Sequence, residues 1–406
     1  MKPPTKTNHD KVDYYFSKNP SFYWMVRSRK SPLLRFVTIL LICYGVVALA
    51  CWRQDALFLP KPSIGFFQDP YFVAVIITMI IVLIMIRRLL LRVEDLIEKF
   101  PQMLKPDQID ELSEKGALSA SSDRVRDIIA LRDPSARKWH RLYMCFWLLI
   151  VVILHVAMPF LDQMGHSSWG VSPRQYPLSY SFAVTSSFLL WLVVAGNLTW
   201  YVFATGFAVF PLIKQYASRE KLWIVPNAPD GQGGLSAIGD VAFGMSTALG
   251  SGMIMLVVWI FLVGAEKAPT ILAGGLYSLV LSATFFGPLR SVHGAMMRAK
   301  NGELDRISSL FRREYEKLPP SNSEDNSTKA TNPALDSELS DRLALMAKLD
   351  AVYTTVNAMP VWPFDLGTIR KFLLLISIPV VSALLQKFWP SAVGTVVAEI
   401  VKGFRP

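Results

Sequence analysis

Apolar residues are gathered in long runs along this chain, and polar, charge-rich segments separate the runs. A helix needs about 20 apolar residues, at about 1.5 Å each, to cross a hydrocarbon layer of about 30 Å. Six runs approach or exceed this length: Phe36–Trp52, Tyr71–Ile86, Leu142–Phe160, Phe182–Phe207, Val241–Ala265 and Pro269–Leu289. The pattern predicts an all-α fold, a polytopic transmembrane bundle of six spans with a helical cytoplasmic layer.

A seventh apolar run, Phe372–Leu385, is shorter and contains Pro379. A run of this length fits a short or re-entrant segment as well as it fits a crossing. We therefore expect a short membrane or interfacial segment over residues 372–406, and the side of the membrane that holds the C-terminus stays open.

The polar segments divide the rest of the chain. Residues 87–141 predict two or three short helices, broken at Pro101, Pro106 and Gly116. In residues 290–371, a leucine-rich stripe after a polar, disordered linker (319–334) needs a partner, either the helix before the linker or a neighbouring subunit. The expected divisions are a cytoplasmic arm (1–35), two spans (36–86), a cytoplasmic helical segment (87–141), four spans (142–289), cytoplasmic helices (290–371) and the C-terminal segment (372–406).

The charge distribution predicts the orientation. The chain has a net charge of +11, and 35 of its 42 lysines and arginines lie in the N-terminal arm and in alternate inter-span segments. Because such residues are retained on the cytoplasmic side, the N-terminus is expected in the cytoplasm. The same distribution argues against nucleic-acid binding, which would need a concentrated basic stripe with interleaved aromatic residues.

A glycine-rich loop before the fifth span is the most unusual stretch of sequence. Its glycines allow successive N–H groups to converge, and the following helix adds its positive N-terminal end, so the loop is a candidate anion site. The alternative is a tight turn in which Asp230 or Ser236 caps the helix. The candidate ligand-binding residues are Asp230, Gly231, Gly233, Gly234, Ser236, Arg290 and His293.

The fifth and sixth spans carry stripes of small residues. Gly244, Ala248 and Gly252 recur every four residues in the fifth span, and Gly274 and Ser278 lie in the sixth. Such stripes let two helices approach closely in lipid, and they can also line a narrow pore. Both interpretations stay open.

Two polar residues lie inside apolar runs, His155 in the third span and Asn197 in the fourth. Polar groups are costly in hydrocarbon and often mark a functional route, although these two can also bond to each other or to a carbonyl. A proline-rich turn at residues 360–365 is expected at the membrane interface, with Trp362 and Phe364 in the headgroup layer and Asp365 as the N-cap of the next helix.

No motif for catalysis, a metal ion or a cofactor is present, and the three cysteines have the spacing of neither a metal site nor a disulfide framework. A non-enzymatic function is therefore favoured, and a membrane enzyme that acts on lipid ranks third. The favoured function is a pore- or channel-like component, homo-oligomeric and gated by its cytoplasmic helices. The alternative is a non-transporting sensor, scaffold or effector that binds a cytoplasmic partner protein or an anionic ligand.

Residues 200–385 resemble a loosely defined group of bacterial multi-pass inner-membrane proteins. The resemblance rests on the Pro229-Asp230-x-x-Gly233-Gly234-Leu235 loop, the Val361–Asp365 turn, and the proline–histidine pair Pro288 and His293. It implies a bacterial inner-membrane location and no activity. The group usually has histidine before the Pro-Asp pair, where this chain has Ala228, so no role for an imidazole is carried over to that position.

Overall fold

The computed structural model describes residues 15, 32–60, 65–109, 116–162, 174–219, 221–225, 228, 230–254, 257, 268–318 and 333–388. Within these residues there is no strand, only an isolated antiparallel bridge between Leu104 and Leu222, so the all-α prediction is confirmed. The elements are α3 (Pro32–Arg53), η1 (Phe66–Gln68), α4 (Pro70–Lys99), η2 (Phe100–Met103), α6 (Ala117–Ile129), α7 (Pro134–Asp162), α8 (Pro177–Leu189), η3 (Leu190–Ala195), α9 (Gly196–Ser218), α10 (Ser236–Gly250), α12 (Ala268–Tyr315), α13 (Pro333–Asn357) and α14 (Leu366–Phe388).

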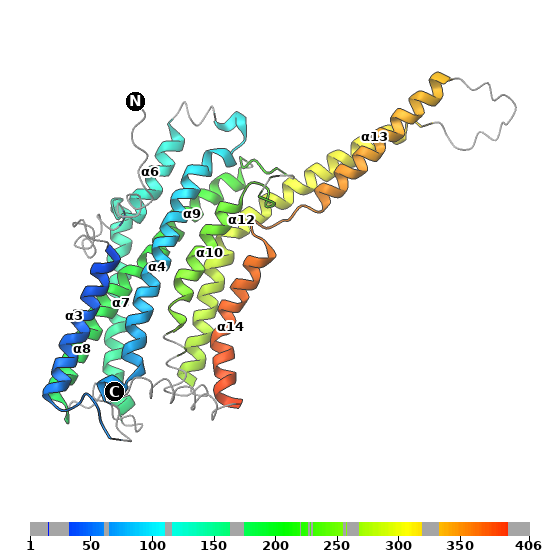
Figure 1. The fold of residues 1–406 in the computed structure, drawn as a ribbon. Helices are drawn as coiled ribbons and strands as arrows, with labels where there is room; N and C mark the ends of the chain where they lie inside the picture. Colours follow the sequence, from blue (N-terminus) through cyan, green and yellow to red (C-terminus); the bar gives the residue numbers. More distant parts are fainter. Residues whose placement is uncertain are drawn as a thin grey trace.

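The long helices run side by side in one bundle, and the C-terminal part of α12 projects from it together with α13 (Figure 1). Helix α3 packs on α8, whereas α10 packs between α4 and α12 and also contacts α14. In the fourth apolar run, α8, the π-helical turn η3 and α9 follow one another directly. A π-helical turn widens the helix locally, and the Trp147 indole donates a hydrogen bond to the Trp191 carbonyl there (2.6 Å).

Three helical stretches are long and apolar enough to cross a membrane: Phe36–Arg53, Ala74–Met103 and Pro177–Ser218. The first and third of these stretches contain the first and fourth predicted spans, and the second contains all but the first three residues of the second predicted span. The third and sixth predicted spans lie in α7 and α12, and the fifth begins in α10, but most of it beyond residue 254 lies outside the described residues. In the part of the chain that the structure describes there are therefore three candidate spans, fewer than the six that the sequence predicts.

Helix α4 continues beyond its predicted boundary at Ile86 to Lys99. The extension buries Leu89, Val93 and Ile97 on the face that packs into the bundle. Only after Lys99 does the chain change to η2, and α6 follows from Ala117. The first part of the predicted cytoplasmic segment is thus an extension of the second predicted span, because its apolar stripe keeps the helical period.

A carboxylate on this extension joins three parts of the chain. Glu94 is 5% exposed and accepts hydrogen bonds from the Tyr15 hydroxyl, from Arg126 Nε (3.2 Å) and from Arg126 Nη2 (2.9 Å). Arg126 lies on α6, and Tyr15 is a fully buried residue of the N-terminal arm. Because a buried charge needs such partners, Glu94 fixes Tyr15 and α6 against α4.

Helices α12 and α13 form an antiparallel arm (Figure 1). Arg342 donates to the Lys317 carbonyl (3.2 Å) near the tip, and Lys300 donates to the Asn357 carbonyl (2.6 Å) at the base. Helix α13 therefore packs on the helix before the linker, although Leu339, Leu343 and Val352 of its leucine-rich stripe are exposed. Residues 319–332 of the predicted linker lie outside the described residues.

Helix α14 is longer than the apolar run that predicts it. It has 23 residues, from Leu366 to Phe388, and runs alongside α12 toward the opposite end of the bundle (Figure 1). At about 1.5 Å per residue it is about as long as a hydrocarbon layer is thick.

Candidate functional site

The glycine-rich loop folds around the carboxylate of Asp230. Oδ1 of Asp230 accepts hydrogen bonds from the N–H groups of Gln232 and Gly234 (both 2.9 Å), and Oδ2 accepts one from Ser236 (3.1 Å). Burial raises the pKa of Asp230, but these hydrogen bonds outweigh it and leave the pKa below its ordinary value. The loop is thus built on an ionised carboxylate of the chain itself.

Glycines are required by this geometry. Gly231, Gly233 and Gly234 have φ values of 63°, 69° and 84°, in the left-handed region that residues with a Cβ atom rarely adopt. A Cβ atom at Gly233 would also lie 3.1 Å from Met359 and 3.2 Å from Ile224. The loop is therefore held by its backbone conformation and by close packing.

The structure brings together the five loop residues of the predicted ligand site, but the N–H groups of Gly234 and Ser236 already bond to Asp230. A foreign anion would have to displace the carboxylate that accepts these bonds. Arg290 is exposed and does not line the site, and the ring of His293 is engaged with the proline-rich turn. Anion binding at this loop stays a prediction. Three of the loop N–H groups that could bind an anion already donate to the Asp230 carboxylate.

The proline-rich turn, residues 360–365, is fixed against α12 and α10. His293 Nδ1 bonds to the Val361 carbonyl (2.8 Å), and its ring stacks on Trp362 with 4.1 Å between centroids. A Cβ atom at Gly239 of α10 would overlap the Pro363 carbonyl oxygen, so this glycine lets the turn lie directly on the helix.

Both ends of the turn are capped. Lys300 Nζ donates to the carbonyls of Asn357 (2.6 Å) and Met359 (3.2 Å), where α13 ends. Asp365 Oδ1 accepts the Thr368 N–H (2.8 Å), which confirms the predicted N-cap of α14. The bonds from Thr368 lower the pKa of Asp365.

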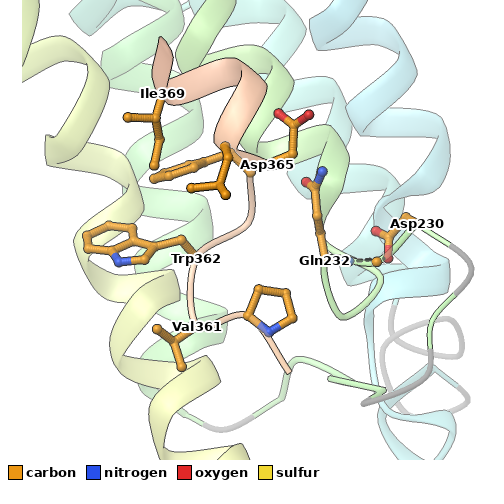
Figure 2. Close-up of a pocket in the computed structure, with 10 residues that line it drawn as sticks. Asp230, Gln232, Val361, Trp362, Asp365 and Ile369 are labelled. Atoms are coloured by element: carbon orange, nitrogen blue, oxygen red, sulfur yellow. Dashed lines mark hydrogen bonds between the residues drawn. The ribbon is translucent and has the colours of Figure 1, made fainter. Parts of the chain in front are cut away.

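A cavity of about 420 Å³ lies between the loop, the turn and the first turns of α14 (Figure 2). This volume is in the range of small-molecule sites, which are mostly apolar with a few placed polar groups. The apolar wall includes Trp362, Phe364 and Ile369, and Gln232 supplies an amide from the loop. The full lining is Asp230, Gly231, Gln232, Pro360, Val361, Trp362, Phe364, Asp365, Leu366 and Ile369.

The small residues of α10 and of the turn that follows it are contact points for neighbouring helices. Cβ atoms built at Gly244 and Gly252 would lie 3.1 Å from Leu89 of α4 and 2.6 Å from the Tyr277 hydroxyl of α12, respectively. Ala248 is 2% exposed. On α12, Gly274 and Ser278 are half-buried. Within one chain, therefore, side chains of α4 and α12 fill the space beside Gly244 and Gly252.

Of the two polar residues inside apolar runs, Asn197 is buried and bonds through Oδ1 to His140 Nε2 (3.2 Å). His140 lies at the start of α7, in the polar stretch before the third predicted span. The side chain of His155 lies outside the described residues. The partner found for Asn197 is thus a histidine that the sequence analysis did not consider.

The loop and the turn are predicted as separate features, and Gln232, Lys300 and Ile369 are not among the predicted site residues. About 130 residues separate the two motifs, and no local pattern connects them. Among the described residues, no group of three His, Cys, Asp or Glu side chains is placed to hold a metal ion.

No protein-family model, curated protein or solved structure matches this chain. The class that the structure defines is an all-helical protein with candidate membrane spans and a cavity between a glycine loop and the base of a two-helix arm.

Proposed function

We propose that this protein is a membrane sensor or effector in which occupancy of the cavity determines the position of the α12–α13 arm. This is the non-transporting alternative of the sequence analysis. One observation carries the proposal: residues 358–365 connect the arm helix α13 to α14, and five of them, Pro360, Val361, Trp362, Phe364 and Asp365, line the cavity. A molecule in the cavity would contact the segment through which α13 joins the bundle.

Contacts at the base of the arm support this coupling. Lys300 and His293 of α12 hold the end of α13 and the turn, and Gly239 of α10 receives the turn from the other side. Packed elements shift between discrete arrangements more readily than they deform continuously. A ligand that favours one position of the turn would therefore favour one position of the arm.

For the membrane arrangement, we propose the six predicted spans in a bacterial inner membrane, α14 as a seventh crossing, and a cytoplasmic N-terminus. The basic inter-span segments and the arm lie toward one end of the bundle (Figure 1), as the positive-inside rule requires of a single cytoplasmic face. The length of α14 supports the seventh crossing, which would put the C-terminus on the opposite side.

The coupling is tested by filling the cavity. Ile369→Trp would enlarge a lining side chain, whereas Leu373→Trp changes a residue on the same helix that is 58% exposed and outside the lining. Spin labels at Ser218 and Ala347, in a background without the three native cysteines, report the distance from bundle to arm. We expect Ile369→Trp to shift this distance by about 2 Å or more, and Leu373→Trp to leave it unchanged. Equal distances in both variants would contradict the proposal.

The pore- or channel-like function takes second place. It is favoured by helices that continue out of the apolar region, as α4 and α12 do. A pore along α10 would have to form in a homo-oligomer, since neighbouring side chains occupy the space beside Gly244 and Gly252 within one chain. Ion flux through reconstituted liposomes, abolished by Gly244→Leu, would favour this function over the sensor.

A further inference from the structure

We infer that the cavity between the glycine loop and the base of the arm binds an organic cation: an amine carried on an apolar group. The inference rests on the proposed function, because it names the class of ligand for the same cavity. It reverses the charge of the ligand that the glycine pattern predicts.

The backbone N–H groups that could bind an anion already have acceptors within the chain. In the loop, Asp230 accepts the N–H groups of Gln232, Gly234 and Ser236. At the start of α14, Asp365 accepts the Thr368 N–H. Each of the two anion-attracting features, the loop and the helix N-terminus, is therefore neutralised by a carboxylate of the chain.

The charged side chains that line the cavity are acidic. Among the described residues that line the cavity, Asp230 and Asp365 are charged, and none is a lysine, arginine or histidine. A carboxylate offers about four lone-pair positions, so both aspartates keep acceptor capacity beyond the bonds that hold the loop and the helix. Lys371 lowers the pKa of Asp365 from a distance but lies outside the lining. The cavity thus offers acceptors to a cation and no charged donor to an anion.

The rest of the cavity wall is largely apolar and aromatic. Phe364 and Ile369 provide apolar surface. The ring of Trp362 stacks on His293 and also on Phe364, with 5.4 Å between the centroids of Trp362 and Phe364. Because Trp362 is stacked on these two rings, it contributes apolar surface to the wall, and the ammonium group is left to the two carboxylates. The volume of about 420 Å³ has room for the apolar part of an amphipathic amine.

Two sources share this chemistry, a free amphipathic amine and the ethanolamine headgroup of a lipid. The test uses the full chain in maltoside micelles, which contain no amine, with decylamine, decanol and decanoate as matched probes in calorimetric titrations against a micelle blank. Adding a lipid with an ethanolamine or a glycerol headgroup as competitor separates the two sources. Competition by the ethanolamine lipid alone identifies a lipid ligand, and competition by neither identifies a free amine.

Three variants locate the binding. Asp365→Asn keeps an N-cap residue and removes one lining charge, Asp305→Asn makes the same change on the exposed surface of the arm, and Ile369→Trp fills the cavity. We expect decylamine to bind at least about tenfold more tightly than decanol, and Asp365→Asn to remove about tenfold of that affinity. Asp305→Asn should change nothing, and Ile369→Trp should abolish binding of both probes.

The inference is overturned if decanoate displaces decylamine, if the two Asp→Asn variants weaken binding equally, or if Ile369→Trp binds normally. The spin-labelled protein separates this inference from the proposed function. Binding of decylamine as expected with no change in the arm distance would keep the ligand class and end the sensor proposal. If the arm distance responds to decanoate but not to decylamine, the sensor proposal is kept and the cationic ligand class is rejected.

Discussion

Two carboxylates, Glu94 and Asp230, are stabilised in opposite ways. Glu94 on α4 is 5% exposed and depends on side chains far away in the sequence, Tyr15 and Arg126. Asp230 is half-buried and depends on backbone N–H groups two, four and six residues further on. The first carboxylate joins separate elements, whereas the second organises a single loop.

The difference determines what the loss of each charge does. A buried ion pair is weak evidence of net stability, but removing one partner leaves the other charge without compensation. Backbone N–H groups of a surface loop can turn to water when their acceptor is lost. We therefore expect changes at Glu94 to affect the whole bundle and changes at Asp230 to remain local.

The largest expected effect is that of Glu94→Gln. It leaves the Arg126 guanidinium, whose side chain is 32% exposed, without its closest counter-charge and weakens the bond from Tyr15. We expect a loss of about 2 kcal/mol in the free energy of unfolding, below the full value for a buried pair because Arg126 is partly hydrated. Thermal unfolding in detergent measures it. The control is Glu98→Gln, an exposed position one turn further along α4, and equal losses at the two positions would refute the distinction.

A smaller and local effect is expected for Asp230→Ala. Three N–H groups lose their acceptor, and at about 0.5–1.5 kcal/mol for each net hydrogen bond the loop should open more often, by about 1–2 kcal/mol after partial hydration. Amide hydrogen exchange should rise in residues 230–236 while α4 and α6 keep their protection. Exchange that rises equally in α6 would show that this carboxylate also supports distant elements.

These two sites mark the limit of what the sequence reveals. The glycines at 231, 233 and 234 and the N-cap Asp365 could be predicted, because their bonding partners lie within a few residues. The Glu94 cluster could not, since Tyr15 and Arg126 are 79 and 32 residues away and no periodic pattern pairs them. The cavity is a similar case: the loop and the turn were each recognised, but only the packing of α10, α12 and α14 brings them together.

The continuation of α4 beyond Ile86 was not predicted, for a different reason. A hydropathy window ends a span at the first charges, here Arg87 and Arg88, whereas α4 continues for as long as its apolar stripe has something to pack against. Its extension beyond Ile86 is therefore where Glu94 meets α6. The predicted break at Pro101 matches the change from α4 to η2, since a proline offers no N–H group to continue the helix.

The smallest expected effect is a dependence of the loop on acid. The pKa of Asp230 is lowered in the folded protein, so its contribution is present above the unfolded value of about 3.9 and is lost as the pH falls through the folded value. Exchange in residues 230–236 should therefore stay slow at pH 5 and rise below about pH 4, after correction for intrinsic rates. Asp230→Asn, which cannot ionise, should show no such rise. A rise of the same size in that variant would mean that another group, and not the Asp230 carboxylate, opens the loop.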